Sequence, residues 1–154
     1  MEIFCMKVHD LLREKARPVY TIASNQSVDD AVNLMSCKKA SALIVTENDL
    51  PVGIFAERDV FRHYLRDKTA ALSETALRHA MTDNLIAAEP EDDVSRVMAI
   101  MLKADIKHLP VMKANKLIGM LTLHDLVEHR IASLIEEIHQ LKDYIDDLHD
   151  AGRD

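Results

Sequence analysis

The sequence predicts a mixed α/β (α+β) fold in which one β-α-β-β-α unit occurs twice, related by pseudo-two-fold symmetry and followed by a long C-terminal helix. Three observations predict it: a repeat at a fixed interval, a helical apolar face behind a capping residue in each copy, and paired apolar runs around polar turns. The interval is 66 residues, the offset from Val28 to Val94. Six positions are identical across it without a gap: Val28/Val94, Met35/Met101, Leu43/Leu109, Val45/Val111, Gly53/Gly119 and Asp59/Asp125. Two such units can bury their apolar faces together and leave a cleft on the symmetry axis.

Each copy opens with a short strand and a helix. In the first copy, 18–23 is a β-like run, and Ser27 is the expected N-cap of the helix, with Asp30 three residues on. In the second copy, Asp93 is the expected N-cap. The apolar residues that follow have the i, i+3, i+4, i+7 spacing of a helix face. They are Val28, Ala31, Val32 and Met35 in the first copy, and Val94, Val97, Met98 and Met101 in the second.

A β-hairpin is predicted next in each copy. Apolar runs at 42–45 and 52–55 flank a turn at Asn48-Asp49, and runs at 108–112 and 117–121 flank Ala114-Asn115. Gly53 and Gly119 lie inside the second strand of each hairpin. A glycine there indicates either close approach of backbone or ligand, or tight strand packing, and the sequence leaves both open.

We expect four segments along the chain: a first unit over 6–67, a linker over 68–76, a second unit over 77–130, and a C-terminal helix and tail over 131–154. The linker is polar and alanine-rich, without proline or glycine. It either extends the preceding helix or forms a loop.

The C-terminal helix carries a heptad seam. Its apolar residues are spaced 4, 3, 4, 3, 4, 3: Val127, Ile131, Leu134, Ile138, Leu141, Ile145 and Leu148. Isoleucine at a and leucine at d favours a parallel homodimer, in which Glu137 at g and Lys142 at e would pair. The alternative is that the seam packs on its own domain. Because the tail lies outside the repeat, the shared core does not need it, and this favours the dimer.

Composition limits the classes of function. A formal charge of −7 over 154 residues argues against a nucleic-acid partner. No apolar run reaches the length of a membrane span, so we expect no membrane insertion, no export and a cytoplasmic protein. Cys5 and Cys37 lack metal-site or CxxC spacing and are expected to be small reduced core residues.

Enzymatic and metal motifs are not evident. The sequence shows no P-loop, no Ser-His-Asp arrangement and no Cys-His pair of recognisable spacing, so no catalytic residue is predicted. His124 and His129 are five apart, which does not align them on one helix face, and no metal site is predicted.

The two helix starts after the hairpins are the candidate sites. GMLTLHDL places Thr122 three residues before Asp125, and GIFAERDV places Ala56, Arg58 and Asp59. These are helix-capping positions, and they are also places where backbone N–H groups attract phosphate and an aspartate can accept ribose hydroxyls. Both interpretations can hold together.

These features together resemble a tandem pair of CBS domains, a Bateman module, over 6–130. The matching stretches are VDDAVNLM, ALIV and PVGIFAERDV in the first copy, and VSRVMAIM, KHLPV and KLIGMLTLHDLV in the second. The resemblance implies two clefts between the halves that bind adenosine-containing ligands such as AMP, ADP, ATP, NAD or S-adenosylmethionine. In that family the aspartate of one half binds the ribose diol, strand residues of the other half hold the adenine, and basic side chains meet phosphate.

The resemblance also implies the site residues. Cleft one would comprise Thr21, Ile22, Ser41, Ala42, Thr122, His124 and Asp125. Cleft two would comprise Ala56, Arg58, Asp59, Ile86, Ala87, Lys107 and His108. Cleft two departs from the family pattern, because Ala56 stands where a hydroxyl residue is usual.

The resulting hypothesis is a non-enzymatic adenine-nucleotide sensor. A ligand between the halves would favour one conformation or assembly and so act on a protein target in trans. The alternative is a structural or adaptor dimer that takes no ligand and recruits a protein partner.

Overall fold

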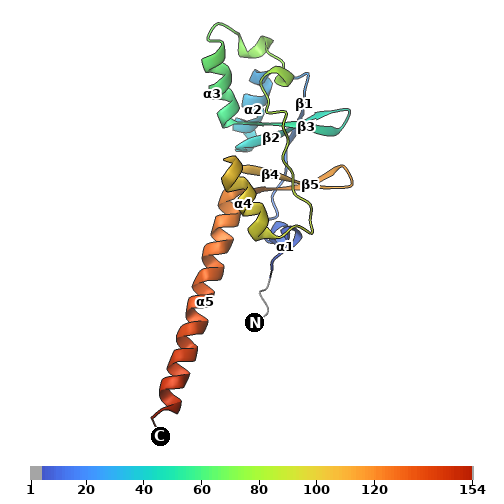
Figure 1. Ribbon diagram of the computed structural model, residues 1–154. Coiled ribbons are helices and arrows are strands. Elements are labelled where there is room, and N and C mark those ends of the chain that lie inside the picture. The colour runs from blue at the N-terminus through green and yellow to red at the C-terminus, as the bar shows by residue number, and fades with distance from the viewer. Residues whose placement is uncertain (1–4, 154) are drawn as a thin grey trace.

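The computed structural model describes residues 5–153 and shows two stacked halves with one long helix projecting from the second (Figure 1). The first half contains β1 Thr21–Ala23, α2 Val28–Lys38, β2 Ala42–Glu47, β3 Leu50–Ala56 and α3 Glu57–Arg66. The second contains α4 Val94–Ala104, β4 His108–Lys113, β5 Lys116–Thr122 and α5 Leu123–Ala151. Helix α1, Val8–Glu14, precedes the first half, and the 3-10 turns η1 Leu72–Glu74 and η2 Leu77–His79 connect the halves. The predicted mixed fold is confirmed.

The two hairpins are close copies of one another. Each closes through a two-residue turn whose residues have positive φ: Asn48 (50°) and Asp49 (62°) in the first, Ala114 (50°) and Asn115 (61°) in the second. Positive φ at both turn positions matches the twist of the flanking strands. The register also shifts at equivalent places, after Val45 and after Val111. The predicted turns are confirmed.

The helix caps differ between the halves. The Ser27 hydroxyl accepts a hydrogen bond from the Asp30 N–H at 3.0 Å, as predicted. Asp93 is the N-cap residue of α4, but its side chain does not bond to that helix. It accepts instead from the Lys7 ammonium at 2.5 Å. The predicted N-cap position is thus confirmed, but Asp93 makes no side-chain cap bond, because a long-range ion pair takes up the carboxylate.

The expected first strand of the second half is reduced to an isolated bridge at Ala88 beside β4. In the first half, the Ile44 N–H donates to the carbonyl of Tyr20 just before β1, and the N–H of Ser24 just after β1 donates to the carbonyl of Thr46. The repeat places Pro110 and Pro90 at those two positions. Proline has no N–H, so the two corresponding hydrogen bonds cannot form in the second half. Only the two backbone bonds of Ala88 remain, from its N–H to the Pro110 carbonyl and from the Met112 N–H to its own carbonyl.

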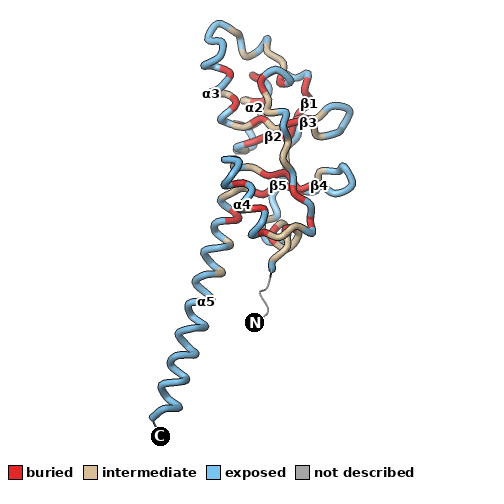
Figure 2. The backbone as a smooth tube through the Cα atoms, in the orientation of Figure 1, coloured by how far each residue is buried: buried red, intermediate tan, exposed pale blue. Residues whose placement is uncertain are grey.

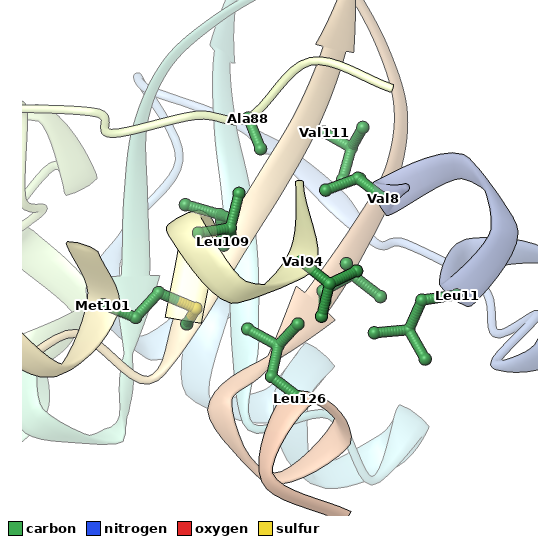
Figure 3. Packing of buried hydrophobic residues seen from close by; sticks show 10 residues of the cluster. Val8, Leu11, Ala88, Val94, Met101, Leu109, Val111 and Leu126 are labelled. Atoms are coloured by element: carbon green, nitrogen blue, oxygen red, sulfur yellow. The ribbon is translucent and has the colours of Figure 1, made fainter. Parts of the chain in front are cut away.

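The core of each half includes residues from outside that half. Helix α1, which precedes the first half in sequence, packs in the second, and η2, which precedes the second half, packs in the first. Val8 and Leu11 of α1 are fully buried with the core residues of the second half, against Val94 and Leu126 (Figure 3). Leu77 of η2 is buried in the same way in the core of the first half. The two halves are thus interlocked by packing as well as stacked.

The sheets of the two halves meet through the faces turned away from their own helices. Ala42 and Ile44 of β2 form a buried cluster with Met120 of β5. Side chains alternate along a strand, so Leu43 and Leu109 point instead into the cores of their own halves. The helix starts at Glu57 and Leu123 follow directly from the strands of this inter-half contact.

Both strand glycines are needed for close packing. A Cβ on Gly53 would lie 2.7 Å from the sulfur of Met81 and 2.7 Å from the carbonyl oxygen of Thr82. A Cβ on Gly119 would lie 2.6 Å from a methyl group of Leu12. Of the two interpretations left open by the sequence, close approach of backbone applies at Gly53, where the Thr82 carbonyl lies, and tight side-chain packing applies at Gly119.

The linker is a loop. Helix α3 ends at Arg66, and Asp67 leaves the helical region with φ −146° and ψ 94°. Its carboxylate accepts hydrogen bonds from the N–H groups of Thr69 and Ala70 at 3.0 and 3.2 Å, which stabilises the turn away from the helix. Helix extension is thereby excluded for this segment.

The expectation that both cysteines lie in the core is wrong. Cys5 and Cys37 are both exposed. Cys37 comes nine positions after Val28, and nine positions of an α-helix make two and a half turns. The Cys37 side chain therefore lies on the face of α2 opposite its apolar face.

Helix α5 lies against the second half only at its beginning. Leu126 is fully buried, but Ile131, Ile138 and Leu141 are 53%, 63% and 62% exposed. Figure 2 shows the projecting part of the helix exposed along its length. The alternative in which the seam packs on its own domain is therefore wrong. No helix within residues 5–153 is long and apolar enough to cross a membrane.

Candidate functional site

Two buried aspartates mark equivalent places in the two halves. Asp59 and Asp125 occupy the third position of α3 and α5 and expose only 3% and 1% of their surface. Each carboxylate accepts a hydrogen bond from the backbone N–H of its own N-cap residue, Ala56 at 2.8 Å and Thr122 at 3.0 Å. The helix N-terminus favours negative charge here.

In the second half the carboxylate also meets a cation from across the molecule. The second oxygen of Asp125 accepts from the Arg17 guanidinium at 2.5 Å. Arg17 lies between α1 and β1, so the segment that leads into the first half reaches the helix start of the second. The Thr122 hydroxyl completes the cap by accepting from the Asp125 N–H at 3.2 Å.

In the first half different groups hold the carboxylate. Asp59 accepts from the Thr82 hydroxyl at 2.8 Å and from the Arg62 guanidinium at 3.1 Å. Arg62 belongs to α3 itself, whereas Thr82 belongs to the segment that leads into the second half. Ala56, the N-cap residue of α3, has no hydroxyl. The hydroxyl that contacts Asp59 is that of Thr82, which comes from a different part of the chain and donates to the carboxylate.

A serine–histidine contact joins the two predicted sets of site residues. Ser41 Oγ, assigned to cleft one, lies 2.8 Å from Nε2 of His108, assigned to cleft two. Burial lowers the pKa of the His108 imidazole, and the charge of Glu57 only partly opposes that shift. His108 is therefore a neutral hydrogen-bonding group at neutral pH rather than a fixed cation for phosphate.

Two hollows differ greatly in size. One of about 330 Å³ shares Arg17 with the Asp125 site and is lined by Leu12, Ala16, Arg17, Pro18, Ile118 and Gly119. The other measures about 40 Å³, and its lining includes Ile86 and Ala87 from the cleft-two prediction. That small hollow lies against Val97 and Ile100 of α4. The large hollow is the one with room for part of a small molecule.

The remaining cleft-one residues are only partly brought together. Ala42 lies in the buried contact between the halves, and Thr21 is exposed on β1. Ile22 is buried in the core of its own half. His124 points to solvent with an 85% exposed side chain and lies 3.8 Å from Glu128 on the same helix.

Among the basic residues predicted for cleft two, Arg58 is engaged elsewhere. Its guanidinium donates to the carbonyl oxygen of Asp105 at 3.1 Å and lies 3.5 Å from the Asp105 carboxylate. Lys107 lies next to His108, and its carbonyl accepts the first N–H of α5, that of Leu123, at 2.9 Å.

Sequence reasoning missed Arg17, Arg62 and Thr82. Arg62 follows Asp59 by three positions on one helix, which is a readable signal for an ion pair. Arg17 and Thr82 precede the first strand of each half without any local motif, so only the interlocked packing reveals them. No cluster of three or more histidine, cysteine or acidic side chains suited to a metal occurs within residues 5–153.

Comparison with known proteins agrees with this architecture. The sequence profile described as "CBS domain" matches residues 8–66 and 77–132. The Arabidopsis thaliana "CBS domain-containing protein CBSX3, mitochondrial" is 33% identical over 127 residues, covering 79% of this chain and 61% of that protein. This chain therefore spans less than two thirds of that relative's length.

Solved structures have the same fold. The CBS-domain containing protein ATU1752 from Agrobacterium tumefaciens matches with a TM-score of 0.74 and 30% identity, over 81% of this chain and 99% of that one. The CBS domain pair of protein MJ0100, described in complex with 5-methylthioadenosine and S-adenosyl-L-methionine, matches with a TM-score of 0.71 and 23% identity. That match covers 84% of this chain and 98% of the other.

Proposed function

This chain belongs to the CBS domain family, and from that premise we propose that it is a regulatory module whose clefts between the halves bind adenosine-containing ligands. The observation that carries the proposal is the pair of buried aspartates, Asp59 and Asp125, at equivalent helix starts. Each is reached by the segment that leads into the other half. A ligand bound at either carboxylate would therefore touch both halves at once.

The chemistry of each site suits a nucleoside. An ionised carboxylate accepts both hydroxyls of a ribose diol, and the helix N-terminus beside it favours a phosphate. The apolar part of the lining of the larger hollow, such as Pro18 and Ile118, would offer contact for a base. The ligands proposed are AMP, ADP, ATP or NAD, with S-adenosylmethionine as a further candidate. The likeness to the MJ0100 pair shows the fold alone, so the proposed ligand class rests on membership of the CBS domain family, and the two carboxylates are the groups that would bind the ribose.

We further propose that the output is conformational and not catalytic. Asp125 lies in the first turn of α5, so a ligand that replaces its contacts acts at the root of the projecting helix. A ligand shifts the module only by its difference in affinity for the two conformations. The readout would be a protein target in trans or a change of assembly.

The exposed seam of α5 supports a homodimer. Six large apolar side chains lie along the projecting part of the helix, each at least 40% exposed: Ile131, Leu134, Ile138, Leu141, Ile145 and Leu148. Pairing with a second copy would cover them, and a parallel arrangement would bring Glu137 near Lys142 of its partner. About three heptads are marginal for an autonomous coiled coil, and the buried Leu126 at the start of α5 anchors the helix on its own domain.

An adaptor that takes no ligand is the alternative, and one observation favours it. Both carboxylates already have partners within the chain, and Ala56 lacks the hydroxyl usual in the family. In that case the module would be a fixed dimer, and the α5 surface would be its functional part.

Calorimetric titration with AMP, ATP, NAD and S-adenosylmethionine separates these functions. We expect saturable binding of at least one ligand. Asp125→Asn or Asp59→Asn should weaken it about tenfold or more in its own cleft, since a charge-assisted hydrogen bond contributes about 1.5–3 kcal/mol. Asp147→Asn, the same change on the exposed end of α5, is the matched control. Absence of binding by all four ligands at millimolar concentration would favour the adaptor.

Sedimentation analysis tests the dimer. Leu141→Glu should shift the chain toward monomer, because it places charge in the apolar seam. Gln140→Glu, next to it and off the seam, should leave the assembly unchanged. A monomeric wild-type chain at micromolar concentration would contradict the dimer proposal.

A further inference from the structure

Arg17 spans the boundary between the halves. Its guanidinium meets the carboxylate of Asp125, 108 positions further along the chain. The Arg17 side chain is 42% exposed, whereas that of Asp125 is 1% exposed. The guanidinium is therefore the member of the ion pair that solutes reach first, and it covers the carboxylate.

The Asp125 carboxylate is bonded within the chain on both oxygens. Oδ2 accepts from the Thr122 N–H at 3.0 Å, and Oδ1 accepts from Arg17. A ribose diol needs the outer side of that carboxylate, so Arg17 has to move before the diol binds. A guanidinium that leaves its carboxylate can bind another anion, and phosphate matches its planar fork in bidentate fashion.

The surroundings leave room for that movement. Arg17 borders the hollow of about 330 Å³, and no other residue of its lining is charged. The lining offers a displaced guanidinium no second carboxylate, and the Glu128 carboxylate at the start of α5 is already paired with Lys15. An uncharged nucleoside would thus break the ion pair without replacing it, whereas a nucleotide would bring the missing anion with it.

The first half lacks this arrangement. Asp59 is held by Arg62 of its own helix and by the Thr82 hydroxyl. The repeat places Asp83 where Arg17 stands in the other copy. A cation supplied from a different part of the chain therefore covers the carboxylate at the Asp125 site, whereas at the Asp59 site the cation belongs to the same helix.

We propose that Arg17 is the specificity-determining residue of cleft one, where it selects phosphorylated adenosine ligands over uncharged nucleosides. In the complex, the ribose takes over Asp125 and the phosphate takes over Arg17. This inference rests on the proposed function, because it presupposes a ribose at Asp125.

The test is calorimetric titration of the full chain with AMP and with adenosine. The proteins compared are wild type, Arg17→Ala, Arg17→Lys and the control Arg13→Ala. Arg13 is exposed on α1, so its replacement removes the same charge from the same segment and leaves Asp125 untouched. Wild type and the control should prefer AMP by about tenfold or more, equivalent to about 1.4 kcal/mol.

Arg17→Ala should weaken AMP, strengthen adenosine and bring the preference below about threefold. Arg17→Lys keeps the charge but lacks the fork, so its preference should be intermediate. If Arg17→Ala unfolds in a thermal scan, the lysine variant decides: a preference equal to that of wild type overturns the inference.

Other outcomes separate this inference from the proposed function. An unchanged AMP preference in Arg17→Ala, or an equal loss of both ligands, overturns the inference and leaves the function standing. Binding lost only in Asp59→Asn places the ligand in cleft two and has the same consequence. If neither AMP nor adenosine binds wild type while another adenosine ligand does, only the inference falls. If none binds, both fall.

Discussion

The helix starts of α3 and α5 carry the same aspartate at the same place in the repeat, yet different groups hold the two carboxylates. Asp59 is paired within its own helix by Arg62, and Asp125 is paired across the molecule by Arg17. The charge pattern around them is exchanged: Glu128 stands where Arg62 does, and Asp83 stands where Arg17 does. The two copies share their backbone fold and the buried aspartate. The paired arginine lies on the same helix in the first half and in the segment before β1 in the second.

This difference teaches that pseudo-symmetry in the backbone does not imply two equal sites. A cation on the same helix moves with its aspartate, whereas a cation from the other half ties the two halves together. Lys15, the C-cap residue of α1, pairs with Glu128 at 2.9 Å and so fixes α1, which packs in the core of the second half, to the start of α5. The start of α5 is thus held to the N-terminal segment by two ion pairs.

The largest expected effect comes from the two strand glycines. Gly53→Ala should lower the free energy of unfolding by about 3 kcal/mol, because the added methyl meets the backbone carbonyl of Thr82. That carbonyl accepts from the Ile54 N–H, and the Thr82 N–H donates to the Ile54 carbonyl, so the backbone there is fixed. Gly119→Ala should cost about 1 kcal/mol, because it meets the tip of the Leu12 side chain, which can rotate. Urea denaturation measures both. Equal costs would show that Leu12 is packed as rigidly as a backbone.

Removal of each cation tests the comparison directly. Arg17→Ala should lower the free energy of unfolding by about 2 kcal/mol, because it leaves a buried carboxylate with only the Thr122 N–H. Arg62→Ala should cost about 1 kcal/mol, since the Thr82 hydroxyl still bonds to Asp59. Both arginines are nearly half exposed, which holds these values below those of fully buried pairs. A larger cost for Arg62→Ala would reverse the proposed difference between the halves.

The N-cap residues of α3 and α5, Ala56 and Thr122, differ by a hydroxyl, and exchanging residue types at the two positions tests its effect on stability. Thr122→Ala should destabilise the chain by about 1 kcal/mol, because the Asp125 N–H loses its acceptor. Ala56→Ser should stabilise it by about 0.5 kcal/mol by supplying the missing cap of α3. Thermal unfolding of the two variants measures the change. A destabilising Ala56→Ser would mean that the inter-half cluster around Ala56 does not tolerate a hydroxyl.

The smallest effect is expected from His108, whose repeat equivalent is Ala42. Because burial lowers its pKa below the ordinary value of 6.5, the unfolded chain binds the proton more readily than the folded one. Its contribution to stability is therefore present above pH 6.5 and is lost as the pH falls through 6.5 toward the folded pKa. His108→Gln should flatten the stability profile in that range. Lys107, Arg17, Glu57 and Asp59 all act on this imidazole, so the comparison is made at fixed ionic strength.

Much of the architecture could be predicted because its signals are local. The cap at Ser27, the turn at Asn48-Asp49 and the helix faces depend on residues within a few positions of one another. The reduced strand at Ala88 was also readable in principle, since Pro90 and Pro110 stand where the first half uses backbone donors. The hypothesis of a ribose at Asp59 and Asp125 came from the family motif, and the binding experiments above test it.

The sequence by itself determined the repeated unit, the family, the positions of both aspartates and the heptad pattern of the last helix, because each is periodic or confined to a short motif. Only the tertiary structure decided that Arg17 meets Asp125, that Ser41 meets His108, and that the seam from Ile131 onward is exposed. The first two contacts join residues 108 and 67 positions apart. Contacts at such separations depend on how the whole chain packs, and no local pattern of side chains encodes them.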